Sequence, residues 1–364
     1  MKLTVWRVPL AEMTDNRFNA PNAPSDASDV RPAVIAAGAA LEHAGVEHGE
    51  YEAVLLLAWA AGCEPGDVRR AMLMGETMDV FLSHGAGMPQ SVLARFDDAL
   101  RRRCAREPLQ YITGSAPFRY LTVSVGPGVF IPRPETEQAV QLALDWLKSH
   151  GITAPKAVDL CAGSGVIGLS IATELPRSEV WAVELEPQAL RWTLRNARRI
   201  CGDADSSVDA AMPSDYSSGS ALGSSSGSAS GSASSSWDFG NYHLVHADAL
   251  NPATLQALDG TADVVVTNPP YVPLDTPPEQ PEVVGWDPDT ALYGGSGDGL
   301  HIPMLLLRRI RTLLRPGGLV VMEHDITQGA ALREAALRMG FVRPRTKPDL
   351  TGRDRFLVAF RDGQ

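Results

Sequence analysis

The chain has 364 residues and a formal net charge of −11, with 44% hydrophobic and 21% charged residues. This length allows two domains, and the composition is that of a globular protein. A protein that grips long nucleic acid through its phosphates is usually basic, so the acidic charge disfavours that class. The longest apolar run, over residues 53–61, is far shorter than the ~20 residues that span a bilayer, and no membrane partner is expected.

The first third of the chain predicts a lead-in followed by a helical domain. Residues 1–28 are rich in Asn, Asp, Pro and Ala, which predicts a poorly ordered segment. Residues 29–107 predict a small helical bundle that recognises a partner. Helix-capping and helix-breaking residues place its helices near 30–43, 50–61, from 65 and from 89. In the last of these, Val92, Phe96, Ala99 and Leu100 share one face.

A change of pattern follows at residues 108–130. Phe118, Leu121, Val123 and Val125 alternate with polar residues, which predicts a β-hairpin that links two domains. A rigid proline-rich segment then leads to a helix that Glu135 or Thr136 can begin.

Residues 131–364 predict an α/β domain with a doubly wound parallel sheet, because strand and helix patterns alternate from residue 156 onward. The predicted strands cover 157–160, 180–184, 242–246, 263–267, 319–323 and 356–360. One predicted helix ends at residue 174, and three others cover 187–200, 300–314 and 328–339. Ser, Gly and Ala dominate residues 203–236, which predicts a flexible surface insertion because such a segment cannot bury a core.

A glycine-rich turn over residues 161–165 follows the first predicted strand and opens a helix, so its amides face a ligand. Glu184 ends the next strand about twenty residues later, the spacing at which an acid takes ribose hydroxyls. Turn and acid together favour a nucleoside site, and Asp248, at the end of the third strand, could bond an adenine amino group. A tight turn with exposed surface acids is the alternative.

Asn268-Pro269-Pro270-Tyr271 ends the fourth predicted strand, where open α/β sheets place their ligands. The prolines stiffen the turn and leave its carbonyls free to accept hydrogen bonds. Acceptor oxygens beside an aromatic ring suit the binding of a planar NH2 group. The four residues resemble the motif of methyltransferases that act on amide or exocyclic amine nitrogens, and an ordinary strand-ending turn is the alternative.

From about residue 30 to the C-terminus, outside the Ser/Gly insertion, the chain resembles the HemK/PrmC family, the N5-glutamine methyltransferases of peptide chain release factors. The motifs that carry this resemblance are Glu107-Pro108 with Tyr111-Ile112-Thr113-Gly114, Ile131-Pro132-Arg133-Pro134-Glu135-Thr136-Glu137, Asp159-Leu160 with Gly163-Ser164-Gly165, Asn268-Pro269-Pro270-Tyr271, and Asp349-Leu350-Thr351-Gly352-Arg353-Asp354-Arg355.

The resemblance implies a class I S-adenosylmethionine-dependent methyltransferase fold, and as acceptor the Gln of the release factor's Gly-Gly-Gln tripeptide. Carried over by motif, the cofactor would contact Cys161, Ala162, Gly163, Ser164, Gly165, Glu184, Asp248, Ala249 and Asn268. The substrate amide would contact Asn268, Pro269, Pro270 and Tyr271, of which Asn268, Pro269 and Tyr271 would be catalytic. Cys161-Ala162 stands where the family usually has Gly-Thr, Glu184 replaces an Asp, and Glu323-His324-Asp325 replaces Glu-His-Gly.

No general base is required, so His301 and His324 are interpreted as structural. The four cysteines show no metal-binding spacing, and no metal is expected. Reduced thiols and the lack of a signal peptide indicate a cytoplasmic protein, which we expect to be a monomer that does not bind nucleic acid directly. The alternatives are a methyltransferase for an exocyclic base amine, one for a ribosomal-protein glutamine, and a non-catalytic module that binds a translation factor.

Overall fold

The computed structural model describes residues 29–84, 88–202 and 235–363. The chain divides into two compact units, Met1–Thr113 and Gly114–Gln364. The expected lead-in over 1–28 lies outside the described residues, as does the expected insertion up to residue 234. Among the described helices, none is both long and apolar enough to cross a membrane.

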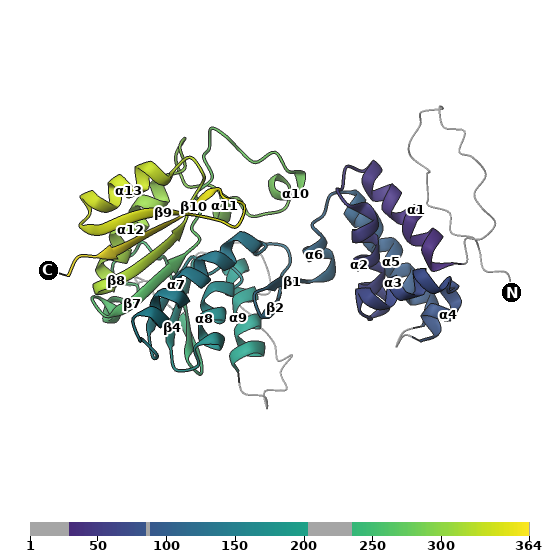
Figure 1. Ribbon diagram of the computed structural model, residues 1–364, viewed down its shortest axis with the longest axis horizontal. Coiled ribbons are helices and arrows are strands. Elements are labelled where there is room, and N and C mark those ends of the chain that lie inside the picture. The colour runs from purple at the N-terminus through teal and green to yellow at the C-terminus, as the bar shows by residue number, and fades with distance from the viewer. Residues whose placement is uncertain (1–28, 85–87, 203–234, 364) are drawn as a thin grey trace, which may run out of the picture. The chain divides into compact units, whose positions relative to one another are not determined.

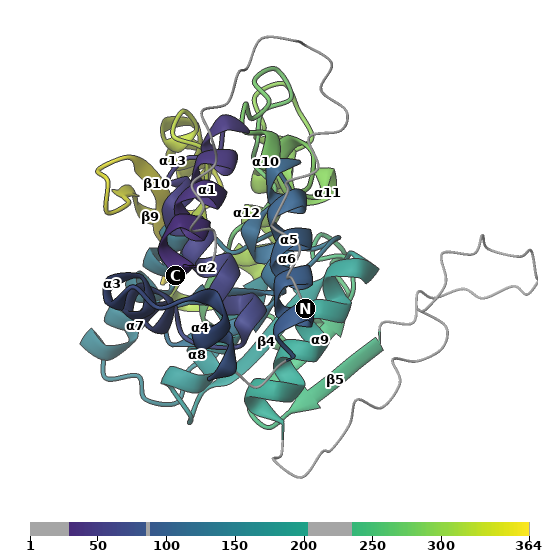
Figure 2. The ribbon, with the colours of Figure 1, turned by 90° about the vertical axis from the view of Figure 1, so that its right-hand side faces the viewer.

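The first unit is helical (Figure 1 and Figure 2). Its helices are α1 (Val30–His43), α2 (Gly49–Ala61), α3 (Pro65–Met74), α4 (Met78–Ser83), α5 (Pro89–Cys104) and α6 (Leu109–Thr113). The predicted helices are confirmed, and α4 and α6 are additional. Helix α2 is capped at its C-terminal end by Gly62, whose φ of 68° is left-handed and therefore suits glycine. The predicted apolar face of α5, with Val92 and Phe96 each 1% exposed, packs into the core of this unit.

The described residues of the second unit form a two-stranded hairpin and an eight-stranded mixed sheet. Its strands are β1 (Ser115–Phe118), β2 (Leu121–Ser124), β3 (Lys156–Leu160), β4 (Glu179–Glu184), β5 (Ser235–Phe239), β6 (Tyr242–His246), β7 (Ala262–Thr267), β8 (Leu314–Glu323), β9 (Phe341–Pro348) and β10 (Asp354–Arg361). Its helices are η1 (Pro134–Thr136), α7 (Glu137–Ser149), α8 (Val166–Glu174), α9 (Pro187–Cys201), η3 (Gln256–Leu258), α10 (Pro281–Val284), α11 (Asp289–Leu292), α12 (His301–Leu313) and α13 (Gly329–Arg338).

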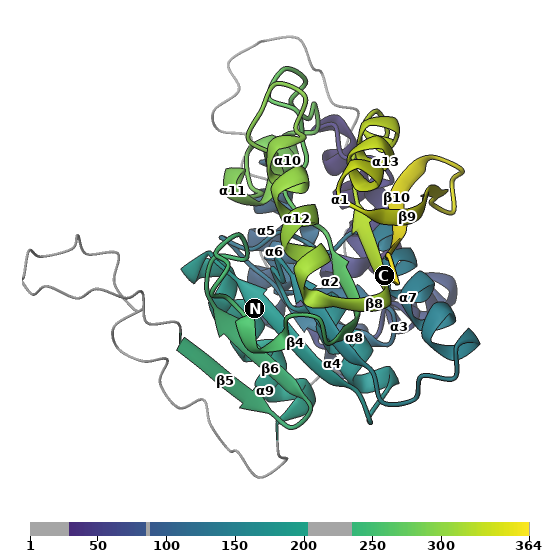
Figure 3. The same cartoon turned by 90° about the vertical axis from the view of Figure 1, so that its left-hand side faces the viewer.

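The large sheet has the strand order β5-β6-β4-β3-β7-β8-β10-β9. Strands β6, β4, β3, β7 and β8 are parallel, and the remaining three pair antiparallel at the two sides. Helices α12 and α13 pack on one face through a shared apolar core that includes Leu306 and Leu332 (Figure 3). Helices α7, α8 and α9 lie side by side on the other face (Figure 1). The predicted doubly wound α/β fold is therefore confirmed.

Four details differ from the sequence-based prediction. Residues 109–113, expected within the hairpin linker over 108–130, form α6, and the hairpin itself is limited to β1 and β2. Strand β5 was not predicted, since residues 235 and 236 were expected in the insertion and no strand was expected over 237–239. Strand β9 was not predicted, because its prolines suit only an edge strand. Strand β8 begins at Leu314 rather than at 319, and a register shift against β7 accommodates the Pro-Gly-Gly sequence.

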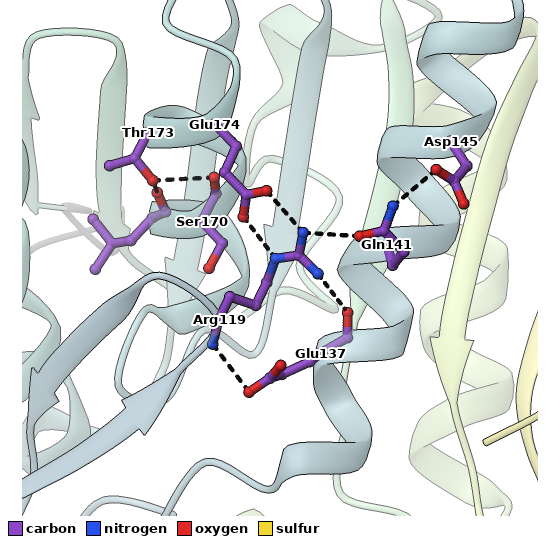
Figure 4. Close-up of polar contacts among 8 residues, drawn as sticks. Arg119, Glu137, Gln141, Asp145, Ser170, Thr173 and Glu174 are labelled. Carbon is purple, nitrogen blue, oxygen red and sulfur yellow. Dashed lines mark hydrogen bonds and ion pairs between the residues drawn. The ribbon is translucent and has the colours of Figure 1, made fainter. Parts of the chain in front are cut away.

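Arg119, at the turn of the hairpin, ties β1 and β2 to helices α7 and α8 (Figure 4). Its guanidinium makes two bonds to the Glu174 carboxylate, at 2.6 and 2.7 Å. It also donates to Gln141 Oε1 at 3.0 Å and to the Glu137 carbonyl at 3.2 Å. The Arg119 side chain is only 9% exposed and that of Glu174 18%, so this pair is largely withdrawn from water.

We expect Arg119→Met to lower the free energy of unfolding of the second unit by about 2 kcal/mol, between the values typical of exposed and fully buried pairs. The physical reason is that Glu174 would keep its charge without a partner. Urea denaturation of the full chain measures this loss. The matched control is Arg338→Met, whose pair with Glu334 is exposed by 62% and 69% and should contribute almost nothing. Equal losses in the two variants would contradict the expectation.

Candidate functional site

A cavity of about 440 Å³ lies beyond the carboxyl ends of strands β3, β4, β6 and β7. Its volume falls within the roughly 300–1,000 Å³ of small-molecule sites. Most of the residues predicted for the site line it: Cys161, Ala162, Gly163, Ser164, Glu184, Asp248, Ala249, Asn268, Pro270 and Tyr271. Gly165 and Pro269 are not part of the lining. The structure thus brings together residues from four separate turns.

The two glycines of the predicted turn, Gly163 and Gly165, are required for different structural reasons. Both have a left-handed φ, 58° at Gly163 and 86° at Gly165. A Cβ on Gly163 would face open space, whereas a Cβ on Gly165 would lie 2.8 Å from Thr193 Cγ2. Gly163 therefore leaves room at the cavity, and Gly165 allows the start of α8 to pack closely against α9.

The Glu184 side chain fixes the glycine-rich turn through a backbone hydrogen bond. Its Oε2 accepts a hydrogen bond from the Gly163 N–H, and its Oε1 accepts one from the Glu186 N–H, both at 2.7 Å. Burial raises the pKa of this carboxyl to about 7. Among the residues that the structure describes, no cation pairs with it. Each oxygen retains acceptor capacity, so the carboxylate can still receive hydroxyl groups from a ligand.

Cys161 adopts a conformation that favours glycine. Its φ is 62°, in the left-handed region that costs a side-chain-bearing residue roughly 1–2 kcal/mol. Burial raises the pKa of the thiol above its usual range, so the sulfur remains protonated and unreactive. Cys161 is therefore a wall of the cavity rather than a nucleophile.

Asp248 is exposed at the rim, and its carboxylate accepts a hydrogen bond from the Leu250 N–H at 2.8 Å. Beside it, Ala249 is 8% exposed and contributes an apolar wall. This pairing of a polar rim with an apolar wall suits a flat heterocycle that carries an amino group.

The Asn268 turn is connected to a buried carboxylate. Asn268 Nδ2 donates to Thr136 Oγ1 at 3.2 Å, and the Thr136 hydroxyl donates to Glu323 Oε2 at 2.7 Å. The Tyr271 hydroxyl donates to the other oxygen, Glu323 Oε1, at 2.9 Å. Glu323 is 2% exposed, and its burial raises the pKa of the carboxyl. The turn after β7 is thus fixed from the end of β8 and from η1.

Several cavity residues were missed from the sequence. They come from the segment before α7 and from around α11: Gly128, Phe130, Pro132, Thr136, Pro288, Thr290, Ala291, Leu292 and Tyr293. Pro132 and Thr136 belong to the motif over 131–137, for which the sequence predicts a rigid entry and a helix start but no contact with the cavity. His301 and His324 do not line the cavity. His324 is fully buried, and this burial lowers the pKa of its imidazole.

Both units resemble known families. Residues 33–114 match the PrmC N-terminal domain, and residues 120–213 match the methyltransferase small domain. The release factor glutamine methyltransferase of Bifidobacterium longum is 51% identical, covering 89% of this chain and 96% of that protein. Proteins of the same name are 41% identical in Streptomyces coelicolor, over 73% of this chain and 80% of that protein, and 35% identical in Corynebacterium glutamicum, over 89% and 95%.

Asp159, at the end of β3 beneath the glycine-rich turn, has no exposed surface. Its Oδ2 accepts a hydrogen bond from the Gly168 N–H at 2.9 Å, and its Oδ1 has no partner among the described residues. Burial raises the pKa of this carboxyl to about 8. The folded state therefore keeps a proton on Asp159 that the unfolded chain, with a pKa of about 4, releases.

The resulting contribution to stability is fully present below about pH 4 and is lost as the pH rises toward 8. We expect Asp159→Asn to abolish this loss, so that relative to wild type it gains at least about 1 kcal/mol between pH 5 and pH 8. Urea denaturation at both pH values measures the difference, and any pH-independent cost of the substitution cancels. Parallel stability curves for the two proteins would show that Asp159 is ionised in the fold.

Proposed function

The chain belongs to the release factor glutamine methyltransferases, and from this premise we propose that it methylates the side-chain amide N5 of the Gln in the Gly-Gly-Gln motif of peptide chain release factors. The methyl donor is S-adenosylmethionine. The observation that carries the proposal is the position of Asn268, which lines the same cavity as the glycine-rich turn and Glu184.

The residues of the cavity fit this cofactor. Glu184 presents a buried carboxylate that pairs with no cation of the described residues, and its oxygens have acceptor capacity for the two ribose hydroxyls. The turn over 161–165 would hold the methionine portion, while Asp248 and Ala249 would lie against the adenine. When bound, S-adenosylmethionine supplies a methyl group on a positively charged sulfur.

Asn268 would activate the substrate amide by orientation. An amide nitrogen is a weak nucleophile because its lone pair is shared with the carbonyl. An acceptor oxygen on one amide hydrogen directs the nitrogen toward the methyl group and stabilises the positive charge that develops on nitrogen. Asn268 Oδ1 is suited to this task, because Nδ2 of the same side chain is occupied by Thr136.

The other residues of the motif would shape the substrate site. Tyr271 and Pro270 line the cavity, and the Tyr271 hydroxyl is held by Glu323, so its ring offers a fixed flat surface for the amide. Pro269, which the resemblance places against the substrate amide, is not among the residues that line the cavity. The proposal therefore places the main catalytic effect on Asn268.

We further propose a cytoplasmic monomer whose helical unit over 29–107 recognises the release factor. All four cysteines are free, as in a reducing compartment. The described lining of the cavity lies between Gly128 and Leu306 of one chain, so a second copy is not needed to complete it.

Transfer of a labelled methyl group to purified release factor tests the proposed function. We expect label on the wild-type release factor and none on a variant in which Gly-Gly-Gln is replaced by Gly-Gly-Ala. Ribosomal protein, RNA and DNA serve as parallel acceptors. Label on any of these, with none on the release factor, would overturn the proposal.

We expect Asn268→Ala to lower the single-turnover rate about 100-fold or more, because it removes an acceptor that acts in the transition state. Cofactor affinity, measured by calorimetry, should fall much less. The matched control is Asn241→Ala, since this amide bonds the Ala172 carbonyl away from the cavity and its loss should leave the rate nearly unchanged. An undiminished rate for Asn268→Ala would remove the residue from the mechanism.

A further inference from the structure

The proposed role of Asn268 depends on which end of its side-chain amide faces the cavity. Oxygen and NH2 have almost the same size, so the amide can rotate by half a turn without a steric penalty. With Oδ1 at the cavity, the group accepts a hydrogen from the substrate amide. With Nδ2 there, two donors face each other and the substrate is repelled. A neighbouring group of the protein must therefore fix the Asn268 amide in the orientation that places Oδ1 at the cavity.

The selection is made by Thr136, through the single hydrogen of its hydroxyl. That hydrogen is donated to Glu323 Oε2 at 2.7 Å, which leaves only lone pairs on Thr136 Oγ1 to face Asn268. The neighbouring amide must then present Nδ2, as it does at 3.2 Å. Among the described residues, no hydrogen-bond donor occupies Asn268 Oδ1, so this oxygen is available to a ligand.

The direction of the Thr136 bond is set in turn by Glu323. An ionised carboxylate can only accept hydrogen bonds, and Glu323 accepts one on each oxygen, from Thr136 and from the Tyr271 hydroxyl. The positive charge of Arg355, on β10, favours the ionised form. Burial at 2% exposure keeps water from competing for these oxygens.

We propose that Glu323 and Thr136 are positioning residues that hold the Asn268 amide with its oxygen toward the substrate. Neither is assigned a contact with the reacting atoms. The inference rests on the proposed function of Asn268 and extends it, because it explains why the motif that contains Thr136 and the motif that contains Asn268 are needed together.

This arrangement fails when Glu323 is protonated. A carboxylic acid can donate to Thr136, whose own hydrogen then turns toward Asn268 and favours the flipped amide. The groups that face Glu323 are Thr136 and Glu135 from η1, Tyr271 from the turn after β7, and Arg355 from β10. Burial raises the pKa of Glu323 above its ordinary value. As the pH is lowered, kcat should therefore begin to fall at a higher pH than it would if an exposed carboxyl were protonated.

The test compares kcat for Gln methylation, at saturating cofactor and release factor, in wild type, Glu323→Gln, Thr136→Val and Thr136→Ser. We expect Glu323→Gln and Thr136→Val to lower kcat about 10- to 100-fold, as is typical for residues that orient a functional side chain. Thr136→Ser keeps the hydroxyl and should restore most of the rate. Cofactor affinity should hardly change, and Glu323→Gln should lose the acidic limb of the wild-type pH profile.

A readout independent of turnover is the NMR signal of the Asn268 side-chain NH2, identified by its loss in Asn268→Asp. It should shift in Glu323→Gln and Thr136→Val and remain in place in Thr136→Ser. Glu334→Gln, an exposed substitution of the same kind, is the control. If Glu323→Gln does not fold, the two Thr136 variants decide the question.

The possible outcomes separate the two proposals. A wild-type protein that does not methylate the release factor overturns the proposed function. If the wild-type protein methylates the release factor, the variants test the positioning role alone. That role is overturned if Thr136→Val and Glu323→Gln have the wild-type kcat and leave the NMR signal of the Asn268 side chain unchanged.

Discussion

The pairing register of three parallel strands is the constraint on which the site depends. The last residue of β3, Leu160, pairs with Val183 on one side and with Thr267 on the other. Parallel strands in register must release their following residues at the same edge of the sheet. Segments that are far apart along the chain, after β3, β4 and β7, therefore meet around one cavity, which is the position that open α/β sheets use for ligands.

Two buried carboxylates keep that edge rigid. Glu184 accepts backbone N–H groups and fixes the glycine-rich turn, whereas Glu323 accepts hydroxyl groups and fixes the Asn268 turn. Burial of a carboxylate is costly unless hydrogen bonds compensate it. In both cases the compensating hydrogen bonds come from groups in the turns that line the cavity. The bonds that make burial of the carboxylate tolerable therefore also fix the positions of these turns.

The glycine-rich turn also tolerates a locally unfavourable residue. Cys161 occupies a left-handed conformation that glycine would adopt without strain. Its backbone is held in place because the adjoining Ala162 N–H donates to the Val183 carbonyl at 3.0 Å. Deviations of this kind persist only where surrounding bonds determine the backbone, and they concentrate at functional sites.

The sequence by itself determined the order of the parallel strands and of the long helices, together with the turns that carry Gly163, Glu184 and Asn268, because apolar periodicity and breaking residues are local signals. It also indicated the family, since the motifs are contiguous. It did not reveal β5, which follows the Ser/Gly-rich segment, or β9, whose prolines are atypical of a strand, nor that the segment around α11 lines the cavity. Only the tertiary structure joined Thr136 to Glu323, because a hydrogen bond between residues 187 positions apart depends on packing that no local pattern records.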